Sequence, residues 1–235
     1  GTGFQGILNH PQAFGPVMAL LAAWTLGRVL AERRLRWVLI GIVAVSMGFV
    51  VMSETRTAGV AMILGVAIAI IAGPWMARQS LRKLMPSLFS RRFLGIAFLC
   101  ITVALAAAPQ VTGVITDFVS KSGRANVEGL FDAYVQSRGV LIDPMLANID
   151  EHPMTGIGFG IASDPLALRV TRDPVLGLPV GASVEKGVVP LAVLEELGLP
   201  GLVLVVAWVW LLVKRAARRG IAPLAVLSVA LLLNM

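Results

Sequence analysis

Residues 57–77 read TAGVAMILGVAIAIIAGPWMA, which is twenty-one consecutive residues without a charge. About 20 apolar residues in a helix are needed to cross the roughly 30 Å of hydrocarbon in a bilayer. This stretch therefore predicts a membrane-spanning helix, and the rest of the chain can be compared with it.

Five further apolar runs lie on either side of this stretch, at about residues 14–30, 36–52, 93–109, 190–213 and 221–235. The last run is shorter than a full span. Because the chain starts at Gly1 rather than Met and stops inside that run, we expect a fragment of a longer protein. The sequence predicts an all-α integral membrane protein, a polytopic helix bundle with about six spans in this chain.

The composition supports a bilayer as the solvent. Hydrophobic residues make up 57% of the chain and charged residues 14%, with a mean hydropathy of +0.85, whereas about 25% of the residues in a soluble domain are charged. The net charge of +7 is divided among separated clusters, which argues against a nucleic-acid partner. The single Cys100 lies in an apolar run, so it cannot form an internal disulfide or a cysteine-based metal site.

The basic residues predict the topology. Thirteen of the twenty Lys and Arg residues lie in three short connections, which contain four, five and four of these residues in chain order. The clusters are Arg28, Arg33, Arg34 and Arg36, then Arg78, Arg82, Lys83, Arg91 and Arg92, then Lys214, Arg215, Arg218 and Arg219. Loops rich in Lys and Arg stay in the cytoplasm. Residues 1–13, the turn at 53–57 and a long segment near 110–189 then face the opposite, periplasmic side.

This topology divides the chain into three parts: four spans with short loops in 1–109, a large periplasmic loop in 110–189, and C-terminal spans in 190–235. A loop of that length is commonly functional. Within it, Asp143-Pro144 predicts a helix start, with Asp143 as N-cap and Pro144 at the first helical position. Met145, Leu146 and Ile149 would form its apolar stripe, and Pro153 would end it.

Arg56 follows Ser53-Glu-Thr55 at the outer end of the span at 57–77. An ionisable residue at that depth is energetically unfavourable unless it pairs with an opposite charge or binds a ligand. One interpretation is an arginine that extends its charge to the interface and is neutralised by Glu54. The other is an anion clamp, since a guanidinium offers a planar fork that matches phosphate oxygens.

The stretch 137–160 combines a second arginine, Arg138, with His152-Pro-Met-Thr-Gly156-Ile-Gly158-Phe-Gly160. His152 follows two acids, Asp150 and Glu151, either of which could orient it, and an imidazole can accept a proton near neutral pH. The bland alternative is an incidental surface histidine. In one unbroken helix Arg138 and His152 would stand about 21 Å apart. Either the chain bends at Asp143-Pro144, or the two residues serve different ends of a long substrate.

The three glycines do not indicate a nucleotide site, because no strand–turn–helix unit surrounds them. A tight turn or a close approach of the backbone to a ligand remains open. His10, just before the first span, is more typical of an interfacial structural residue. Glu195 and Glu196 leave two arrangements open: a span that begins only after Pro200, preceded by an outer helix, or acids that face a polar cavity.

Several pieces together resemble one family, the O-antigen ligase and Wzy-type polymerase superfamily of bacterial multi-spanning glycosyltransferases, and they occur in the family's order. The pieces are Phe4-Gln-Gly6 with His10-Pro-Gln12, Ser53-Glu-Thr-Arg56, Ser137-Arg138, the His152–Gly160 stretch, and Leu194-Glu-Glu-Leu-Gly198-Leu-Pro-Gly201. The chain departs from the family at Glu185-Lys-Gly187, where many relatives have His-Asn.

The resemblance implies a function at the periplasmic face of the bacterial inner membrane. Arg56 and Arg138 would grip the pyrophosphate of an undecaprenyl-pyrophosphate-linked glycan, and His152 would be the base that activates an acceptor hydroxyl. Gly156, Gly158 and Gly160 would line the substrate site. Family members need no metal, nucleotide or other cofactor.

The acceptor would be the lipid A core for a ligase or a growing glycan for a polymerase, and a relative that glycosylates protein is a further alternative. From another class, a transporter or flippase would use Arg56 and Glu54 as charges along a substrate path. A membrane scaffold is the third interpretation.

Overall fold

The computed structural model describes residues 11–33, 36–53, 55–91, 93–95, 98, 102, 142–159 and 188–234. In these residues the regular structure is helical, without strands. The chain divides into two compact units: Gly1–Ala125 with Leu211–Leu233 form the first, and Asn126–Trp210 with Asn234–Met235 form the second. Each unit is described by itself.

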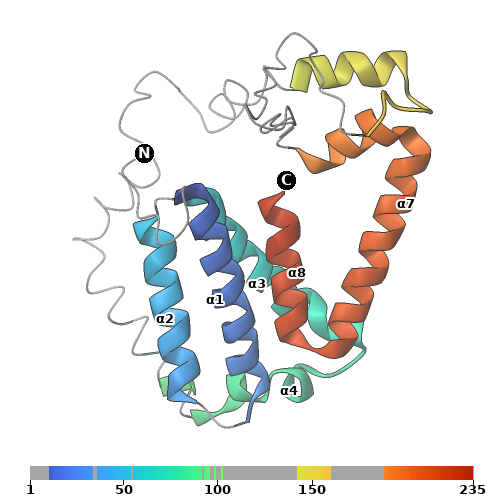
Figure 1. The fold of residues 1–235 in the computed structure, drawn as a ribbon. Helices are drawn as coiled ribbons and strands as arrows, with labels where there is room; N and C mark the ends of the chain where they lie inside the picture. The colour runs from blue at the N-terminus through green and yellow to red at the C-terminus, as the bar shows by residue number, and fades with distance from the viewer. Residues whose placement is uncertain are drawn as a thin grey trace, which may run out of the picture. The chain divides into compact units, whose positions relative to one another are not determined.

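Five helices follow the apolar runs closely (Figure 1). They are α1 (Pro11–Ala31), α2 (Trp37–Met52), α3 (Arg56–Ala77), α7 (Val189–Arg219) and α8 (Ile221–Leu233). The short helix α4 (Leu81–Leu84) and the 3₁₀ helix η1 (Pro86–Phe89) lie in the connection after α3. A further helix covers residues 142–151.

Three helical segments are long and apolar enough to cross a membrane: Ala13–Ala31, Thr57–Ala77 and Val189–Arg219. The helices Trp37–Met52 and Ile221–Leu233 are apolar but shorter. The expected span at 93–109 falls mostly outside the described residues. The length and composition of these helices indicate a helical membrane protein. The number of six spans stays a prediction.

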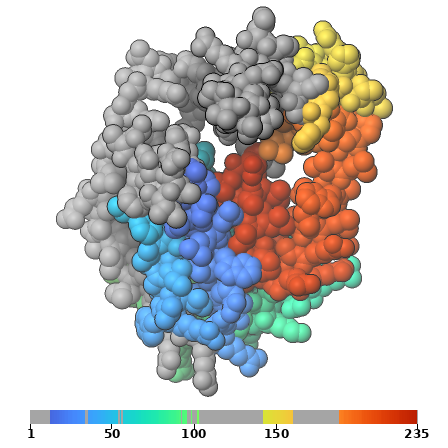
Figure 2. Space-filling view, in the orientation of Figure 1, coloured from blue at the N-terminus to red at the C-terminus, as the bar shows by residue number. Residues whose placement is uncertain are grey.

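Small residues bring the helices of the first unit together. A Cβ atom added to Gly27 in α1 would lie closer than 3.0 Å to Ala222 in α8, and one added to Gly65 in α3 would lie equally close to Val229. Figure 2 shows α1 and α2 side by side on one face, with α8 next to α1. Close approach at small residues is how helices gain van der Waals contact in a bilayer, where apolar side chains are not driven together by water.

The three basic connections meet at one end of this unit. The Ser87 hydroxyl, in η1, donates a hydrogen bond to the backbone carbonyl of Glu32, just after α1. A Cβ on Gly73, near the end of α3, would contact Ile221 at the start of α8. The predicted clustering of the basic loops on one side of the bundle is therefore observed, whereas the membrane face that this end occupies stays a prediction.

Two details of the helix at 142–151 correct the prediction. It already includes residue 142, so Asp143 lies in its first turn rather than at the N-cap. A carboxylate there is still favoured by the positive end of the helix dipole. Leu146 is 45% exposed, and the packed stripe contains Met145, Asn148 and Ile149 instead. The helix ends at residue 151, just before Pro153, as predicted.

Candidate functional site

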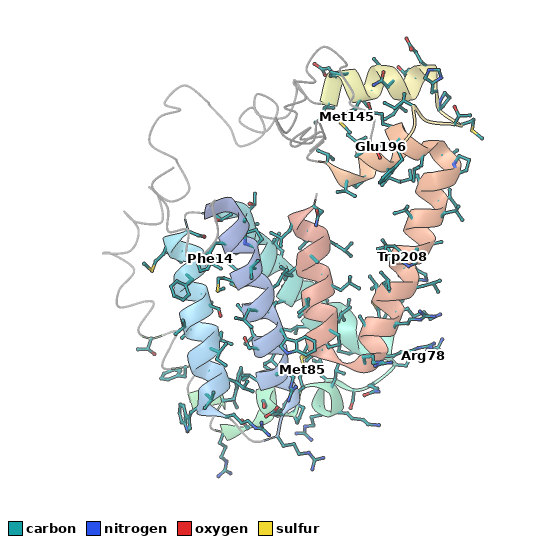
Figure 3. All side chains as sticks on the ribbon, in the orientation of Figure 1. Phe14, Arg78, Met85, Met145, Glu196 and Trp208 are labelled. Carbon is teal, nitrogen blue, oxygen red and sulfur yellow. The ribbon has the colours of Figure 1, made fainter. Side chains whose placement is uncertain are left out.

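The second unit joins two of the sequence motifs, His152–Gly158 and Glu195–Leu199. The turn that follows the helix at 142–151 packs against the first part of α7 (Figure 3, where Met145 and Glu196 are labelled on the two elements). Residues 159–194 separate the two motifs in the sequence. The structure shows that they form one assembly.

The assembly originates in an interruption of α7. Gly198 has φ 67° and ψ −173°, which is not helical, so α7 consists of two helical segments that meet at this residue. Pro200, two positions later, has no N–H to donate. Two carbonyl groups before the break, those of Glu195 and Glu196, therefore lose the donors that residues 199 and 200 would supply in a continuous helix.

The turn supplies the missing donors. The N–H of Ile157 donates to the Glu195 carbonyl (2.8 Å), and the N–H of Gly158 donates to the Glu196 carbonyl (3.1 Å). In return, the N–H of Leu199 donates to the carbonyl of Pro153 (2.9 Å). Three backbone hydrogen bonds thus fasten the turn to the break, because buried backbone groups must be paired.

Glycine is required on both sides of this contact. Gly156 and Gly198 both have φ +67°, a backbone conformation that residues with a side chain rarely adopt. A Cβ on Gly156 would lie closer than 3.0 Å to the backbone of Glu196, and one on Gly198 equally close to the backbone of Met154. The group that approaches Gly156 closely is the chain's own backbone, and an approach to a ligand stays a prediction.

Glu195 is the buried polar centre of the assembly. Its side chain has 0% exposure, and its Oε1 accepts a hydrogen bond from the Nδ2 of Asn148 at 2.7 Å. A carboxylate without water needs such donors, since burying an unpaired charge is very unfavourable. Met145, one turn before Asn148, is also fully buried. Asn148 thus fixes the helix at 142–151 to α7.

His152 lies immediately beside this contact, at the end of the helix at 142–151. Its N–H donates to the Asn148 carbonyl (3.0 Å) and its own carbonyl accepts from the N–H of Gly156 (2.9 Å). Its side chain is exposed. In the described part of the chain no ion pair joins the imidazole to Asp150 or Glu151, and an orienting role for either acid stays a prediction. The backbone of His152 is held, and its side chain faces outward.

Arg56 belongs to the first unit, where it is the first residue of α3. The turn before it is packed tightly against α1. The Ser53 and Thr55 hydroxyls are buried and lie 2.8 Å apart, and the Ser53 hydroxyl donates to the Val50 carbonyl at 2.8 Å. A Cβ on Gly15 would be too close to both hydroxyls. This packing fixes the point at which α3 begins, at the end of the bundle opposite the basic connections.

Several predicted residues lie outside the described part of the chain. They are Arg138, Gly160, His10, Glu54, Glu185 and Lys186. Arg56 belongs to the first unit and His152 to the second, so each is described within its own unit. Among the described residues no group of three or more His, Cys, Asp or Glu side chains could hold a metal ion.

The hydrogen bond between Asn148 and Glu195 was not predicted from the sequence. Two signals were present. Asn148 is three residues after Met145 and one before Ile149, which places a polar group within a buried helical stripe. Pro200 four residues after Glu196 meant that the Glu196 carbonyl needed a donor from elsewhere.

No family model, curated protein or solved structure matches this chain.

Proposed function

We propose that this chain belongs to an enzyme that transfers a glycan from undecaprenyl pyrophosphate to an acceptor hydroxyl at the periplasmic face of the inner membrane. The observation that carries the proposal is the turn at His152. Three hydrogen bonds and two obligatory glycines hold its backbone, and the imidazole stays open to solvent. A general base needs this combination of a fixed position and an accessible side chain.

In the proposed reaction the His152 imidazole takes the proton of the acceptor hydroxyl. The hydroxyl oxygen forms a bond to the anomeric carbon of the glycan while the bond from that carbon to the pyrophosphate oxygen breaks. The lipid pyrophosphate leaves with the electron pair. Arg56 and Arg138 stabilise the negative charge that develops on it, since guanidinium groups bind phosphate oxygens in a bidentate manner.

The test is transfer activity in cells whose own copy of the gene is deleted and replaced by wild type, His152→Ala or Met154→Ala. Met154 lies in the same turn, is 59% exposed and has no proton to exchange, so Met154→Ala is the matched control. We expect His152→Ala to reduce transfer at least about 100-fold, with unchanged membrane levels, and Met154→Ala to retain it. Transfer at the wild-type rate in His152→Ala would remove this residue from the mechanism.

The same strains distinguish the related activities by their glycan profiles. Long chains that accumulate on the lipid carrier indicate a ligase, and single repeats on lipid A indicate a polymerase. Arg56→Lys provides a second arm. Lysine keeps the charge without the planar fork, so a phosphate clamp predicts impaired transfer, whereas an arginine that only reaches the interface predicts full activity.

A further inference from the structure

A pocket of about 580 Å³ lies between the last turns of α7 and the following helix, α8. It belongs to the first unit, at the end where the basic connections meet. Its lining combines charge with apolar surface: Leu212, Arg215, Ala216, Arg218, Arg219 and Leu227. None of the residues proposed for glycan transfer contributes to it.

The local backbone explains how the pocket forms. α7 ends at Arg219, and Gly220, with φ +127°, turns the chain directly into α8. Leu227 on α8 and Leu212 on α7 both line the pocket. Arg215 and Arg219 are four residues apart and Arg215 and Arg218 three apart, so all three lie on neighbouring positions of one helical face.

In the described part of the chain these three arginines have no counter-charge, unlike Arg28 and Arg36 in the first basic connection. Within the first unit, the one acid among the described residues is Glu32, and its carboxylate pairs with Arg28 (2.8 Å) and Arg36 (2.9 Å). The guanidinium of Arg82 lies over the ring of Phe89, 5.5 Å from its centre. No ion pair reaches Arg215, Arg218 or Arg219 in the described part of the chain.

Like charges three and four residues apart in a helix destabilise it, so an anion that binds among these arginines would stabilise the helix end. The apolar wall specifies which kind of anion. A free phosphate gains nothing from Leu212 and Leu227, whereas the acyl chain of a lipid can pack on both. Basic pockets between membrane helices at the cytoplasmic side are suited to lipid headgroups.

We propose that this pocket binds the phosphodiester headgroup of an anionic membrane phospholipid. The phosphate oxygens accept hydrogen bonds from Arg215, Arg218 and Arg219, and an acyl chain lies against Leu212 and Leu227. The arginines thereby anchor the α7–α8 turn to the anionic leaflet. This site is independent of glycan transfer.

The experiment is lipid binding by the purified full chain, measured by native mass spectrometry and by thermal unfolding in detergent with added phosphatidylglycerol or phosphatidylcholine. We expect phosphatidylglycerol to bind and to raise the unfolding temperature, and phosphatidylcholine to do neither. Arg215→Gln/Arg218→Gln/Arg219→Gln should bind phosphatidylglycerol about 100-fold more weakly, because each arginine near an anionic surface contributes a factor of about five.

The matched control is Arg78→Gln/Arg82→Gln/Lys83→Gln, which removes the same charge from the connection after α3 and should keep the binding. Equal losses in both triple variants would show a response to net charge alone and overturn the site. Competition by millimolar inorganic phosphate would assign the pocket to a free anion rather than a lipid. Should the first triple variant not fold, Leu227→Gln tests the apolar wall: unchanged phosphatidylglycerol binding would also contradict the proposal.

Discussion

At the scale of single residues, the most informative side chain in the second unit is a buried carboxylate. Glu195 lies in α7 with no exposed surface and accepts a hydrogen bond from Asn148. A hydrogen bond to a charged group contributes about 1.5–3 kcal/mol, and a buried group that loses its donor pays the full desolvation penalty. The pair therefore holds the helix at 142–151, and with it the backbone of His152, against α7.

We expect Asn148→Leu to destabilise the protein by about 1.5–3 kcal/mol, because the Glu195 carboxylate would lose this donor. Thermal unfolding in detergent measures the loss. Asn148→Leu/Glu195→Leu should recover much of it, since replacing both partners with apolar groups removes the buried charge together with its donor. Leu146→Ala, on the exposed side of the same helix, is the control and should change little. If the double variant were as unstable as Asn148→Leu alone, loss of this hydrogen bond would not be the cause of the destabilisation.

At the scale of elements, the interruption of α7 at Gly198 decides the shape of the candidate site. An unbroken helix would satisfy the carbonyls of Glu195 and Glu196 internally and leave the turn at 153–158 without partners. The left-handed Gly198 and the missing N–H of Pro200 together turn these carbonyls into acceptors for Ile157 and Gly158. The arrangement agrees with the first alternative from the sequence, in which a separate helical segment precedes Pro200.

Gly198→Ala should therefore release the turn. The substitution places an alanine at φ 67° and ψ −173°, an essentially glycine-only conformation that costs about 1–3 kcal/mol, and adds a Cβ that overlaps the Met154 backbone. We expect faster protease cleavage near 153–158 and, if the proposed function holds, a loss of glycan transfer. The matched control is Gly48→Ala in α2, where an added Cβ meets nothing within 4 Å. Equal protease sensitivity in the two variants would contradict the role assigned to the interruption.

At the scale of the whole molecule, the distribution of charge predicts which residues face which compartment. In the first unit the three basic connections share one end, and the turn before Arg56 lies at the opposite end, against Gly15. If the basic end is cytoplasmic, we expect the loop that contains His152 to be periplasmic, because Val189–Arg219 is long and apolar enough to cross the membrane before the chain reaches the third basic cluster.

Single cysteines in a Cys100→Ser background test this assignment, because Gln79 and Thr155 are both exposed. A membrane-impermeant thiol reagent added to intact cells should label Thr155→Cys and leave Gln79→Cys unlabelled. Permeabilised cells should show labelling of both, which verifies that each site is reactive. The reverse pattern in intact cells would invert the topology and place His152 in the cytoplasm, away from the proposed substrate.

The sequence alone determined the features that depend on local composition. Apolar runs of about 20 residues specify helices in a bilayer because backbone groups there can be satisfied only within the segment. The boundaries of α2 and α3 and the end of the helix at 142–151 before Pro153 were predicted to within a residue or two for this reason. The position of the basic connections at one end of the bundle was also predicted from the sequence, because two apolar runs separate each basic connection from the next.

Only the tertiary structure decided how the turn after His152 meets α7. Gly156, Gly158 and Gly198 could be recognised as places where the backbone turns, but a glycine does not specify what approaches it. Asn148 and Glu195 are forty-seven positions apart, and their hydrogen bond depends on two helices meeting in one register. Pairings of this kind depend on which carbonyl and N–H groups are still without partners once each helix has formed. No local sequence pattern specifies which distant group will pair with them.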